Sequence, residues 1–453
     1  MSASRLNSLE KKSIITLASV YGLRMFGLFL ILPVLAIYAE QLQGATPALM
    51  GLALGIYGVT QAALQIPFGL LSDKYGRKPI IYIGLTIFII GSLIAAAADT
   101  ISGVIIGRAL QGAGAIAAVI LALTSDLTRE NQRTKAMAGI GMTIGMAFIL
   151  ALIAAPILQA YIGVKGLFVL TAGLASLSLL LIWKVLPTPV QTQNLEVRAI
   201  PHKMLSLIKH PQLLRLDIGI FILHFVLTAM FVVVPIILLE HAKLPSQDHW
   251  RVYVPALLGS VLFMLPMVIL SSRKHLLMRI FRAAICLLLF AQCLLMWRPL
   301  GVAGMTICLF FFFWGFNLLE AMLPSLVSRV APAAAKGSAM GVYNTFQFMG
   351  VFVGGFLGGT LYGEAGVTGV FVVCGLLLLV WIWVVQTSPQ LRLLDSVVVL
   401  LPVPLNGQTD DYQQRMESVT GVEEVIIIAE ENTAYLKVDK ERLDQAALDA
   451  IST

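Results

Sequence analysis

The chain has 453 residues, of which 58% are hydrophobic and only 12% are charged, whereas an ordinary soluble domain carries about 25% charged residues. This composition excludes a soluble globular protein for most of the chain and indicates a membrane protein. The formal net charge of +7 resembles that of many nucleic-acid-binding proteins, but the positions of the basic residues point to membrane topology instead.

The predicted elements begin with a polar N-terminal segment, residues 1–13, which lacks the small-residue cleavage site of a signal peptide. Apolar segments of about 20 residues, long enough to cross a hydrocarbon core as helices, then recur as far as residue 386. They predict twelve spans, at residues 14–38, 48–71, 79–98, 100–125, 136–160, 165–186, 214–239, 252–271, 280–297, 301–328, 337–362 and 366–386.

Lysine and arginine alternate between the two sides of these spans. They concentrate in the N-terminus and in the loops after the even-numbered spans, and they are scarce in the other loops. This is the positive-inside pattern, which predicts that both termini lie in the cytosol. Because topology explains the basic balance, the sequence predicts membrane lipid, and no nucleic acid, as its surroundings.

The longest polar break, residues 187–213, divides the spans six and six. It separates an N-terminal half, residues 1–186, from a C-terminal half, residues 214–388. Two six-helix halves with a cytosolic connector are typical of transporters built from parallel repeats, in which the substrate site lies between the halves near the midplane. The fold class is therefore an all-α polytopic membrane protein.

Residues 389–453 have the composition of a small soluble domain. The pattern predicts strands at 396–401, 422–429 and 433–438, with the last two paired across 430–432, and helices at 410–417 and 441–451. This order fits a ferredoxin-like α/β domain without its last strand. The segment contains no cysteine, so a metal-carrying role is not expected, and a regulatory, ligand-binding or self-associating module is the prediction.

The four cysteines give no sign of a cofactor or a disulfide. All of them fall inside predicted spans, without the spacing of a metal site, and they are interpreted as packing residues: Cys286, Cys293, Cys308 and Cys374.

A ten-residue motif follows the second span. From Gly69 to Lys78 it reads GLLSDKYGRK, which resembles the G-x-x-x-D-[RK]-x-G-[RK]-[RK] signature of the major facilitator superfamily, at the place where that family carries it. The glycines, Gly76 included, permit a tight turn and a close helix approach, and Asp73 and Arg77 are placed to pair with other helices. The competing interpretation is a basic turn that merely follows the charge rule.

The fourth span carries a second motif of the same family. Its sequence RALQGAG, from Arg108 to Gly114, resembles R-x-x-Q-G-x-G, and Arg108 and Gln111 share one helix face. The same resemblance implies that Asp126, at the end of this span, pairs with Arg77. It also implies a conformational gate that locks the two halves together, formed by Gly69, Asp73, Gly76, Arg77, Lys78 and Asp126. A helix cap or a solvated surface acid is the alternative for Asp126.

Two glycine patterns bear on the kind of transporter. The G-x-x-x-G-P-x-x-G-G motif of drug/proton antiporters is only partly present in the fifth span, where Gly141 and Gly145 match but Met146-Ala147 and the absence of a Gly-Gly pair depart from it. The eleventh span holds a small-residue face suited to close helix packing, formed by Gly350, Gly354, Gly355, Gly358 and Gly359.

Nearly the whole chain is similar to YajR-type transporters, which carry a C-terminal YAM domain. The resemblance rests on Arg24 to Gly27, Leu32 to Val34, the motif after the second span, Asn317 to Pro324 and the appended domain. It implies the twelve-helix facilitator fold and a proton-coupled role. It leaves the substrate open.

Four ionisable residues lie deep in the predicted spans: Arg24 in the first, Arg108 in the fourth, His224 in the seventh and Glu320 in the tenth. At about 1.5 Å per residue they lie roughly 12–15 Å deep in a core about 30 Å thick. Because a charge is costly there, such residues mark a pathway or a partner. These four spans are also the cavity-lining set that the resemblance implies.

Glu320 is the first candidate for a proton carrier, with Asn317 one turn earlier on the same face, and His224 is the second because imidazole titrates near neutral pH. The alternatives are a fixed partner of an arginine for Glu320 and an interhelical hydrogen bonder for His224. Arg24 and Arg108, with Gln111, either contact substrate or the proton path or serve the structure alone.

These observations predict a secondary active transporter of the bacterial inner membrane that works by alternating access, with proton-coupled efflux of a small amphiphilic compound as the favoured function. Uptake or facilitated diffusion of a polar or anionic metabolite is one alternative. A membrane sensor that signals through its C-terminal domain is another. An enzyme is not expected, because the sequence shows no nucleophile-base arrangement, metal-ligand spacing or phosphate loop.

Overall fold

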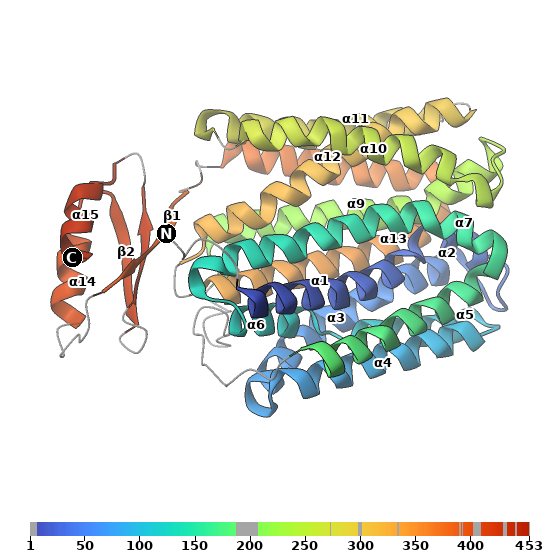
Figure 1. Cartoon of the computed structure of the whole chain (residues 1–453). Helices are drawn as coiled ribbons and strands as arrows, with labels where there is room; N and C mark the ends of the chain where they lie inside the picture. The colour runs from blue at the N-terminus through green and yellow to red at the C-terminus, as the bar shows by residue number, and fades with distance from the viewer. Residues whose placement is uncertain are drawn as a thin grey trace.

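A computed structural model describes residues 7–186, 207–271, 273–297, 301–332, 335–388, 391, 393–401, 409–428, 433–439 and 442–452. It consists of a helical body and a small α/β domain that lies beside one end of the body (Figure 1). We call this end of the body the terminal end and the opposite end the distal end. Most of the predicted connector, residues 187–213, lies outside the described residues.

The N-terminal half contains seven helices as the structure divides them. They are α1 (Ser8–Phe29), α2 (Leu32–Ala39), α3 (Pro47–Tyr75), α4 (Arg77–Ala97), α5 (Ile101–Ala113), α6 (Ala117–Asp126) and α7 (Glu130–Val185). The C-terminal half contains α9 (Pro211–Glu240), the short 3-10 helix η1 (Ser246–Asp248), α10 (Trp250–Ser271), α11 (Lys274–Met296), α12 (Gly301–Val330) and α13 (Lys336–Thr387).

Ten helices in the described part of the chain are long and apolar enough to cross a membrane. Two of them, α7 with 56 residues and α13 with 52, are about twice the usual length. Each changes direction at a glycine, Gly163 with φ 67° in α7 and Gly366 with φ 64° in α13. Glycine adopts this left-handed conformation without a steric penalty. Each of these helices therefore supplies two crossings, which confirms the predicted twelve.

Two predicted spans are broken rather than continuous. The first divides into α1 and α2 at Leu30 and Ile31, just before Pro33, and the fourth divides into α5 and α6 at residues 114–116. Proline removes a backbone donor and glycine weakens a helix. Hydrophobicity continues across both breaks, which is why the sequence pattern did not show them.

Glycines let α13 approach two neighbouring helices. A β-carbon on Gly350, Gly354 or Gly358 would meet backbone atoms of α9 at 2.3–2.9 Å. Gly355 and Gly359 face α3 instead, where a β-carbon would meet backbone atoms at 2.2–2.9 Å. The predicted packing role of this glycine face is confirmed, and it serves both halves of the protein.

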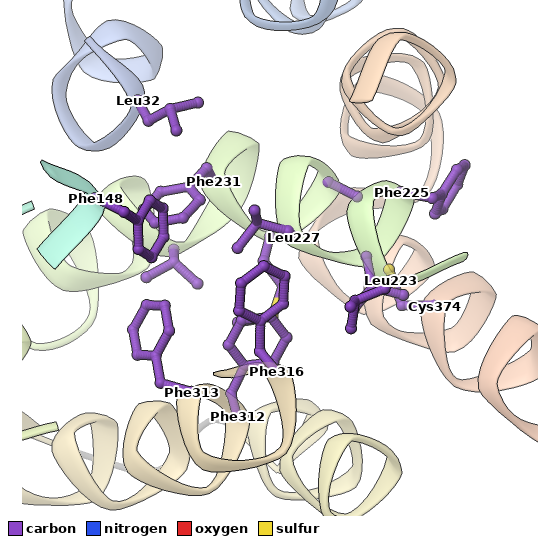
Figure 2. Packing of buried hydrophobic residues seen from close by; sticks show 14 of the residues in the cluster. Leu32, Phe148, Leu223, Phe225, Leu227, Phe231, Phe312, Phe313, Phe316 and Cys374 are labelled. Carbon is purple, nitrogen blue, oxygen red and sulfur yellow. The ribbon is translucent and has the colours of Figure 1, made fainter. Parts of the chain in front are cut away.

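A shared hydrophobic core joins the two halves at the distal side. It combines residues from the distal parts of α2, α3, α5 and α7 with residues from all the long helices of the C-terminal half. Figure 2 shows Phe148 of α7 among Phe231 and Phe313 of the C-terminal half. On the terminal side the N-terminal half has a separate core, to which only Val351 comes from the C-terminal half among the described buried residues. The halves are thus packed together at the distal end.

The cysteines divide into two groups. Cys308 and Cys374 are buried and pack in the core as predicted, whereas Cys286 and Cys293 are exposed. The exposed pair contradicts a packing role, because both side chains leave the interior of the helical body.

The α/β domain has the predicted order of elements. It contains β1 (Asp395–Leu400), α14 (Thr409–Glu417), β2 (Val422–Ile428), β3 (Thr433–Val438) and α15 (Gln445–Ser452). The sheet is antiparallel with strand order β1-β3-β2, which agrees with a ferredoxin-like domain lacking its last strand. The predicted link across residues 430–432 lies outside the described residues, and the final helix begins at Gln445 rather than at 441.

Candidate functional site

The two titratable residues predicted for the C-terminal half lie next to each other. His224 Nε2 of α9 is 3.9 Å from Glu320 Oε2 of α12. Gln347 of α13 bridges them, since its Nε2 is 2.9 Å from His224 Nε2 and 3.3 Å from Glu320 Oε1. Three different helices therefore bring together one polar cluster, which we call the His224–Gln347–Glu320 cluster.

The hydrogen bonds indicate which nitrogen of His224 carries a proton. Its Nδ1 lies 3.3 Å from the carbonyl oxygen of Ile220, which can only accept, so Nδ1 is the donor. Its Nε2 then accepts from the amide of Gln347 in the neutral imidazole. The side chain of Glu320 retains 38% exposure against 10% for His224, although its Oε2 atom is buried.

An aromatic layer covers this cluster on its distal side. Phe316 lies one turn before Glu320 on α12, and its ring is 5.7 Å from that of His224. Phe148 of the N-terminal half contacts Phe316 and Phe313 at 6.1 and 6.2 Å between ring centroids, and Phe29 contacts Phe148 at 5.2 Å. The layer joins the halves and separates the polar cluster from the distal end.

Asn317 lies near the cluster but has a different partner. Its Nδ2 donates to Ser260 Oγ of α10 at 3.1 Å. The predicted shared face with Glu320 does not create a hydrogen bond between the two side chains among the contacts of the described residues.

The two predicted arginines are fully buried in the N-terminal half. Arg24 donates to the carbonyl oxygen of Gly114 at 2.9 Å and to Gln61 Oε1 at 3.3 Å. Its guanidinium also lies 5.2 Å from the ring of Phe88. These partners are neutral, and carbonyl oxygens and aromatic faces are the groups that stabilise a buried cation in the absence of a carboxylate.

Arg108 has a similar environment. It donates to Gln111 Oε1 at 2.8 Å, which confirms that the two share a helix face, and to the carbonyl oxygens of Ala53 and Leu54 of α3. Its guanidinium lies 4.5 Å from the ring of Tyr57. Neither arginine contacts Glu320 in the described part of the chain, and both hold helices of one half together.

The break between α5 and α6 explains one of these contacts. Residues 114–116 lie outside both helices, and the carbonyl oxygen of Gly114 accepts from Ile116 N and from Arg24, each at 2.9 Å. Gln111, in the last turn before the break, also donates to Ser92 of α4 at 2.8 Å. Broken helices whose backbone groups face polar partners are common near the binding sites of secondary transporters.

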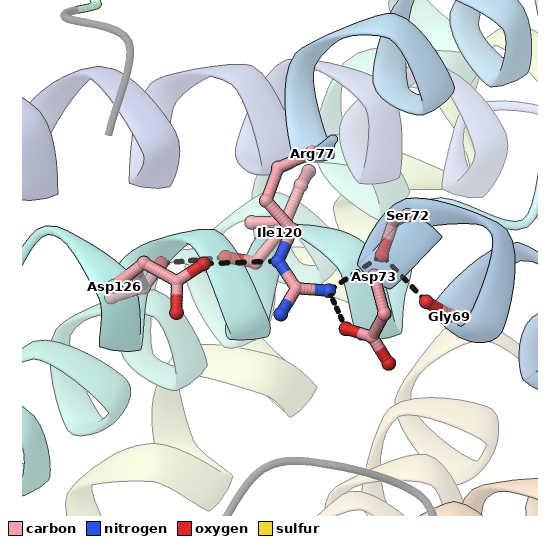
Figure 3. Close-up of polar contacts among 7 residues, drawn as sticks. Gly69, Ser72, Asp73, Arg77, Ile120 and Asp126 are labelled. Carbon is pink, nitrogen blue, oxygen red and sulfur yellow. Dashed lines mark hydrogen bonds and ion pairs between the residues drawn. The ribbon is translucent and has the colours of Figure 1, made fainter. Parts of the chain in front are cut away.

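The motif after the second span forms a charged cluster at the terminal end (Figure 3). Arg77, at the start of α4, binds Asp73 of α3 and donates from Nε to Asp126 Oδ2 of α6 at 2.9 Å. It also donates to Ser72 Oγ at 2.7 Å. We call Asp73, Arg77 and Asp126 the charged triad. In the described part of the chain, the hydrogen-bond partners of Arg77 belong to the N-terminal half.

The other motif residues shape the same turn. Gly76 has φ 93°, a value that favours glycine, and it permits the tight turn between α3 and α4. Lys78 donates to the carbonyl oxygen of Leu186 at the end of α7. Gly69 is less constrained, because a β-carbon there would first meet Ala118 at 4.0 Å.

Two members of the site were missed by sequence reasoning. Gln347 is uncharged, so a search for ionisable residues in the spans did not find it. Asp217 of α9 is an acid within a predicted span and is 1% exposed, but it lies too near the end of the span to satisfy the depth criterion. A search for every polar residue in the apolar spans would have found both.

An apolar cavity of about 440 Å³ lies between α10, α11 and α12, lined among others by Met267, Cys286 and Trp314. None of the predicted site residues lines it. It is therefore separate from the polar cluster.

Comparisons with known proteins agree with this geometry. Residues 17–354 match the sequence profile of the Major Facilitator Superfamily. The inner membrane transport protein YajR of Escherichia coli is 41% identical over 431 residues, which cover 95% of this chain and 94% of YajR.

Two solved transporters share the fold at low sequence identity. The nucleoside transporter NupG aligns with a TM-score of 0.67 and 16% identity over 83% of this chain and 99% of its own. The human organic anion transporter MFSD10 aligns with a TM-score of 0.61 and 17% identity over 84% of this chain and 100% of its own. The chain is therefore a multi-pass membrane transporter that belongs to the Major Facilitator Superfamily.

Proposed function

We propose that this transporter moves a small amphiphilic compound out of the bacterial cytosol in exchange for protons, with both termini on the cytosolic side of the inner membrane. The His224–Gln347–Glu320 cluster carries the proposal. It places an acid and an imidazole in the interior of the membrane, next to the aromatic layer that joins the two halves. Titratable groups at such a depth are characteristic of proton relays.

Gln347 gives the cluster two protonation states with different hydrogen bonds. When Glu320 is ionised, the two N–H groups of the Gln347 amide can serve the carboxylate and His224 Nε2 together. When Glu320 takes up a proton, its carboxyl group becomes a donor and loses its negative charge. The neutral form is easier to enclose in an apolar interior, so protonation favours a state in which Glu320 is enclosed.

The packing of the halves fits one state of an alternating-access cycle. The shared core and the aromatic layer close the distal side, which is the periplasmic side in the proposed orientation. In the opposite state these contacts separate and the terminal ends of the halves meet. We propose that the charged triad holds the terminal ends of α3, α4 and α6 in the arrangement needed for the two halves to pack together at the terminal end in that state.

The aromatic layer and the single acid next to it suit an amphiphilic substrate with an apolar body. The alternative hypothesis, uptake of an anionic metabolite, was based on Arg24 and Arg108 as binding groups for the anion. Both arginines have neutral partners and no exposed surface in this conformation. The arrangement therefore favours the export proposal. Residues 389–453 form a separate domain in this proposal, with a regulatory role toward the helical body.

The experiment uses the full chain in liposomes with an imposed pH gradient and two fluorescent probes, the lipophilic cation ethidium and the anion carboxyfluorescein. We expect gradient-driven movement of ethidium, and we expect Glu320→Gln to abolish the response to the gradient while binding, measured by fluorescence polarisation, remains. Glu364→Gln is the matched control, because Glu364 is an exposed acid of the same helical body.

Three outcomes distinguish the alternatives. Gradient-driven movement of carboxyfluorescein alone favours the anionic metabolite. Movement of ethidium that Glu320→Gln leaves unchanged removes the proton role from Glu320. Binding of ligands without any flux identifies a sensor.

A further inference from the structure

Asp217 is a buried acid that the proposed function does not use. It lies in α9 and is 1% exposed, and its Oδ1 has no hydrogen-bond partner among the described residues. A carboxylate without partners is costly inside an apolar helical bundle. Such a group is expected to exchange a proton or to meet a transient partner.

Asp217 lies between the terminal end and the His224–Gln347–Glu320 cluster. It is seven residues, or about 10 Å of helix rise, from His224 on α9 in the direction of the terminal end. From the start of α9 at Pro211 it is about 9 Å deep, whereas Glu320 is about 15 Å from the end of α12 at Val330. A proton that leaves Glu320 for the terminal end therefore passes the level of Asp217.

Tyr343 lies near the level of Asp217 on the neighbouring helix α13. It lies on α13 one turn from Gln347, in the direction of the terminal end. The packing of Gly350 on Phe221 and of Gly354 on Phe225 sets the register of α13 against α9, and the same register places Tyr343 within one helical turn of the level of Asp217.

The phenol of Tyr343 has the properties of an intermediate group. It is buried, and its hydroxyl has no hydrogen-bond partner among the described residues. It interacts electrostatically with both Glu320 and Asp217. Glu320 also has one oxygen, Oε2, without a hydrogen bond in the same part of the chain. Asp217 of α9, Tyr343 of α13 and Glu320 of α12 thus each have a polar atom with free hydrogen-bonding capacity. We refer to these three groups as the row.

The other charged or titratable groups near this row are few. His224 lies deeper on α9 and already has two hydrogen-bond contacts, and Arg215 lies two residues before Asp217 on the same helix. Glu320 from α12 and Tyr343 from α13 are the groups that the packed helices contribute to the electrostatics of the row. The row therefore consists of two acids and a phenol that interacts with both of them.

We infer that Asp217 is a second proton-binding acid and that Tyr343 passes protons between Asp217 and Glu320. In this step the Glu320 carboxyl group gives its proton to the phenol oxygen while the phenol proton moves to the Asp217 carboxylate. Glu320 ends ionised, Tyr343 ends neutral and Asp217 ends protonated, so charge and protons balance. A hydroxyl can do this because it donates and accepts at once.

This inference rests on the proposed proton role of Glu320, but its test needs no substrate. Infrared difference spectra of the purified full chain, recorded through a pH titration, detect the C=O stretch of buried protonated carboxyl groups separately from that of exposed ones. We expect two buried bands in the unmodified protein. Asp217→Asn should remove one of them, Glu320→Gln should remove the other, and the exposed-acid control Glu364→Gln should remove neither.

The relay is tested by the rate at which the Glu320 band appears after a rapid pH drop. Tyr343→Phe keeps the ring and removes the hydroxyl. Both Tyr343→Phe and Asp217→Asn should slow this appearance about a hundredfold, the lower end of the range of about 10²–10⁴ for loss of a positioned proton-transfer group. Asp217→Glu should restore the rate if Asp217→Asn acts through the lost proton site rather than through misfolding.

Two results overturn the inference. One is a spectrum of Asp217→Asn that keeps both buried bands, and the other is an unchanged rate in Tyr343→Phe. Failure of the proposed function gives a different result, in which gradient-driven flux survives in Glu320→Gln while the Asp217 band is still present and still titrates.

Discussion

Arg77 shows how a single residue organises the terminal end of the N-terminal half. Its guanidinium joins Asp73 of α3 to Asp126 of α6, and all three side chains are at least three-quarters buried. Removal of the cation leaves two carboxylates close together with no positive charge between them. Because the pairing is partly desolvated, its loss is expected to exceed the range of about 0–1 kcal/mol for an exposed pair.

Arg77→Ala is predicted to raise the fraction of molecules with separated terminal ends. The state with joined terminal ends needs an ordered surface on α3, α4 and α6, whereas the separated state tolerates disorder there. A difference of about 1.4 kcal/mol between the states changes their ratio tenfold. Accessibility of a cysteine introduced for Lys74, measured by the rate of maleimide labelling in a background without the native cysteines, reports the shift.

The control for this prediction is Asp99→Asn. Asp99 pairs with Lys165 at 2.5 Å, but both side chains are largely exposed, so the variant should leave the labelling rate unchanged. Equal labelling in Arg77→Ala and the unmodified protein would show that the triad serves folding rather than the access equilibrium.

Residue-level prediction from sequence succeeded where charge or a motif marked the residue. The pairing of Arg77 with Asp126 and the shared helix face of Arg108 and Gln111 were predicted and are present. Gln347 could not be recognised as a site residue from the sequence. A neutral amide in an apolar span gives no sign that it bridges an acid and a histidine on two other helices. The neutral partners of the two arginines could not be predicted either. Backbone carbonyl groups occur at every residue, and no single residue type marks the position where a helix breaks.

At the scale of helices, the contact between α3 and α13 holds the two halves together. Gly51 and Gly55 of α3 meet Gly355, Phe352 and Gly359 of α13, and a β-carbon at Gly51 would lie 2.1 Å from the carbonyl oxygen of Gly355. No side chain can move aside at this position, since the atoms in contact belong to two backbones. The contact therefore requires glycine at both position 51 and position 355.

Gly51→Ala is predicted to separate the distal ends of the halves. The expected result is a higher labelling rate of a cysteine introduced for Gln41, an exposed residue of the distal end. Gly173→Ala is the matched control, because a β-carbon at Gly173 meets nothing within 4 Å. A variant that accumulates normally and labels at the unmodified rate would contradict the role of this contact.

Sequence predicted the elements more completely than their irregularities. Twelve spans and the order of the C-terminal strands and helices follow from hydrophobic periodicity, and the structure has them. The breaks at residues 30–31 and 114–116 were not predicted, because they depend on which tertiary partner satisfies the freed backbone groups, such as Arg24 for the carbonyl of Gly114. Periodicity contains no information about such partners.

At the scale of the whole molecule, the C-terminal domain contacts the end of α12, the helix that carries Glu320. Lys437 of β3 is 1% exposed, and its Nζ donates to the carbonyl oxygens of Ser328 and Arg329 at 2.9 and 3.2 Å. Arg329 also pairs with Asp395 of β1 at 3.4 Å. The last carbonyls of a helix lack partners within the helix, so Lys437 caps α12 from a separate domain.

This contact is predicted to strengthen as the pH rises above about 8. Burial, and then the charge of Lys336, lowers the pKa of Lys437 to about 8, with Glu424 and Asp395 acting in the opposite direction and Arg329 in the same one. An exposed lysine has a pKa of about 10.4. Between these two pKa values the docked domain binds fewer protons than the undocked one. The equilibrium constant for docking therefore increases by up to tenfold per pH unit.

The neutral amine of Lys437 keeps two N–H groups for the carbonyl oxygens of Ser328 and Arg329. The contact between the domain and α12 therefore persists when Lys437 loses its proton. The distance between spin labels introduced for Gln414 of the domain and Arg273 of the body, both exposed, measures the docked fraction. Lys437→Met should abolish the pH dependence. A docked fraction that falls between pH 8 and pH 10 would contradict the sign of this linkage.

The central claim is that protonation of Glu320 shifts the molecule between two access states. Its most direct test is a pair of distance distributions from spin labels in a background without native cysteines, one pair introduced for Lys74 and Arg273 at the terminal ends of the two halves and one for Gln41 and Lys243 at the distal ends. The account predicts that the two pairs change in opposite directions between about pH 5 and about pH 8, the range in which such groups exchange protons near neutrality. It further predicts that Glu320→Gln gives the same distributions at both pH values. Distributions that do not respond to pH in the unmodified protein, or that still respond in Glu320→Gln, would contradict the claim.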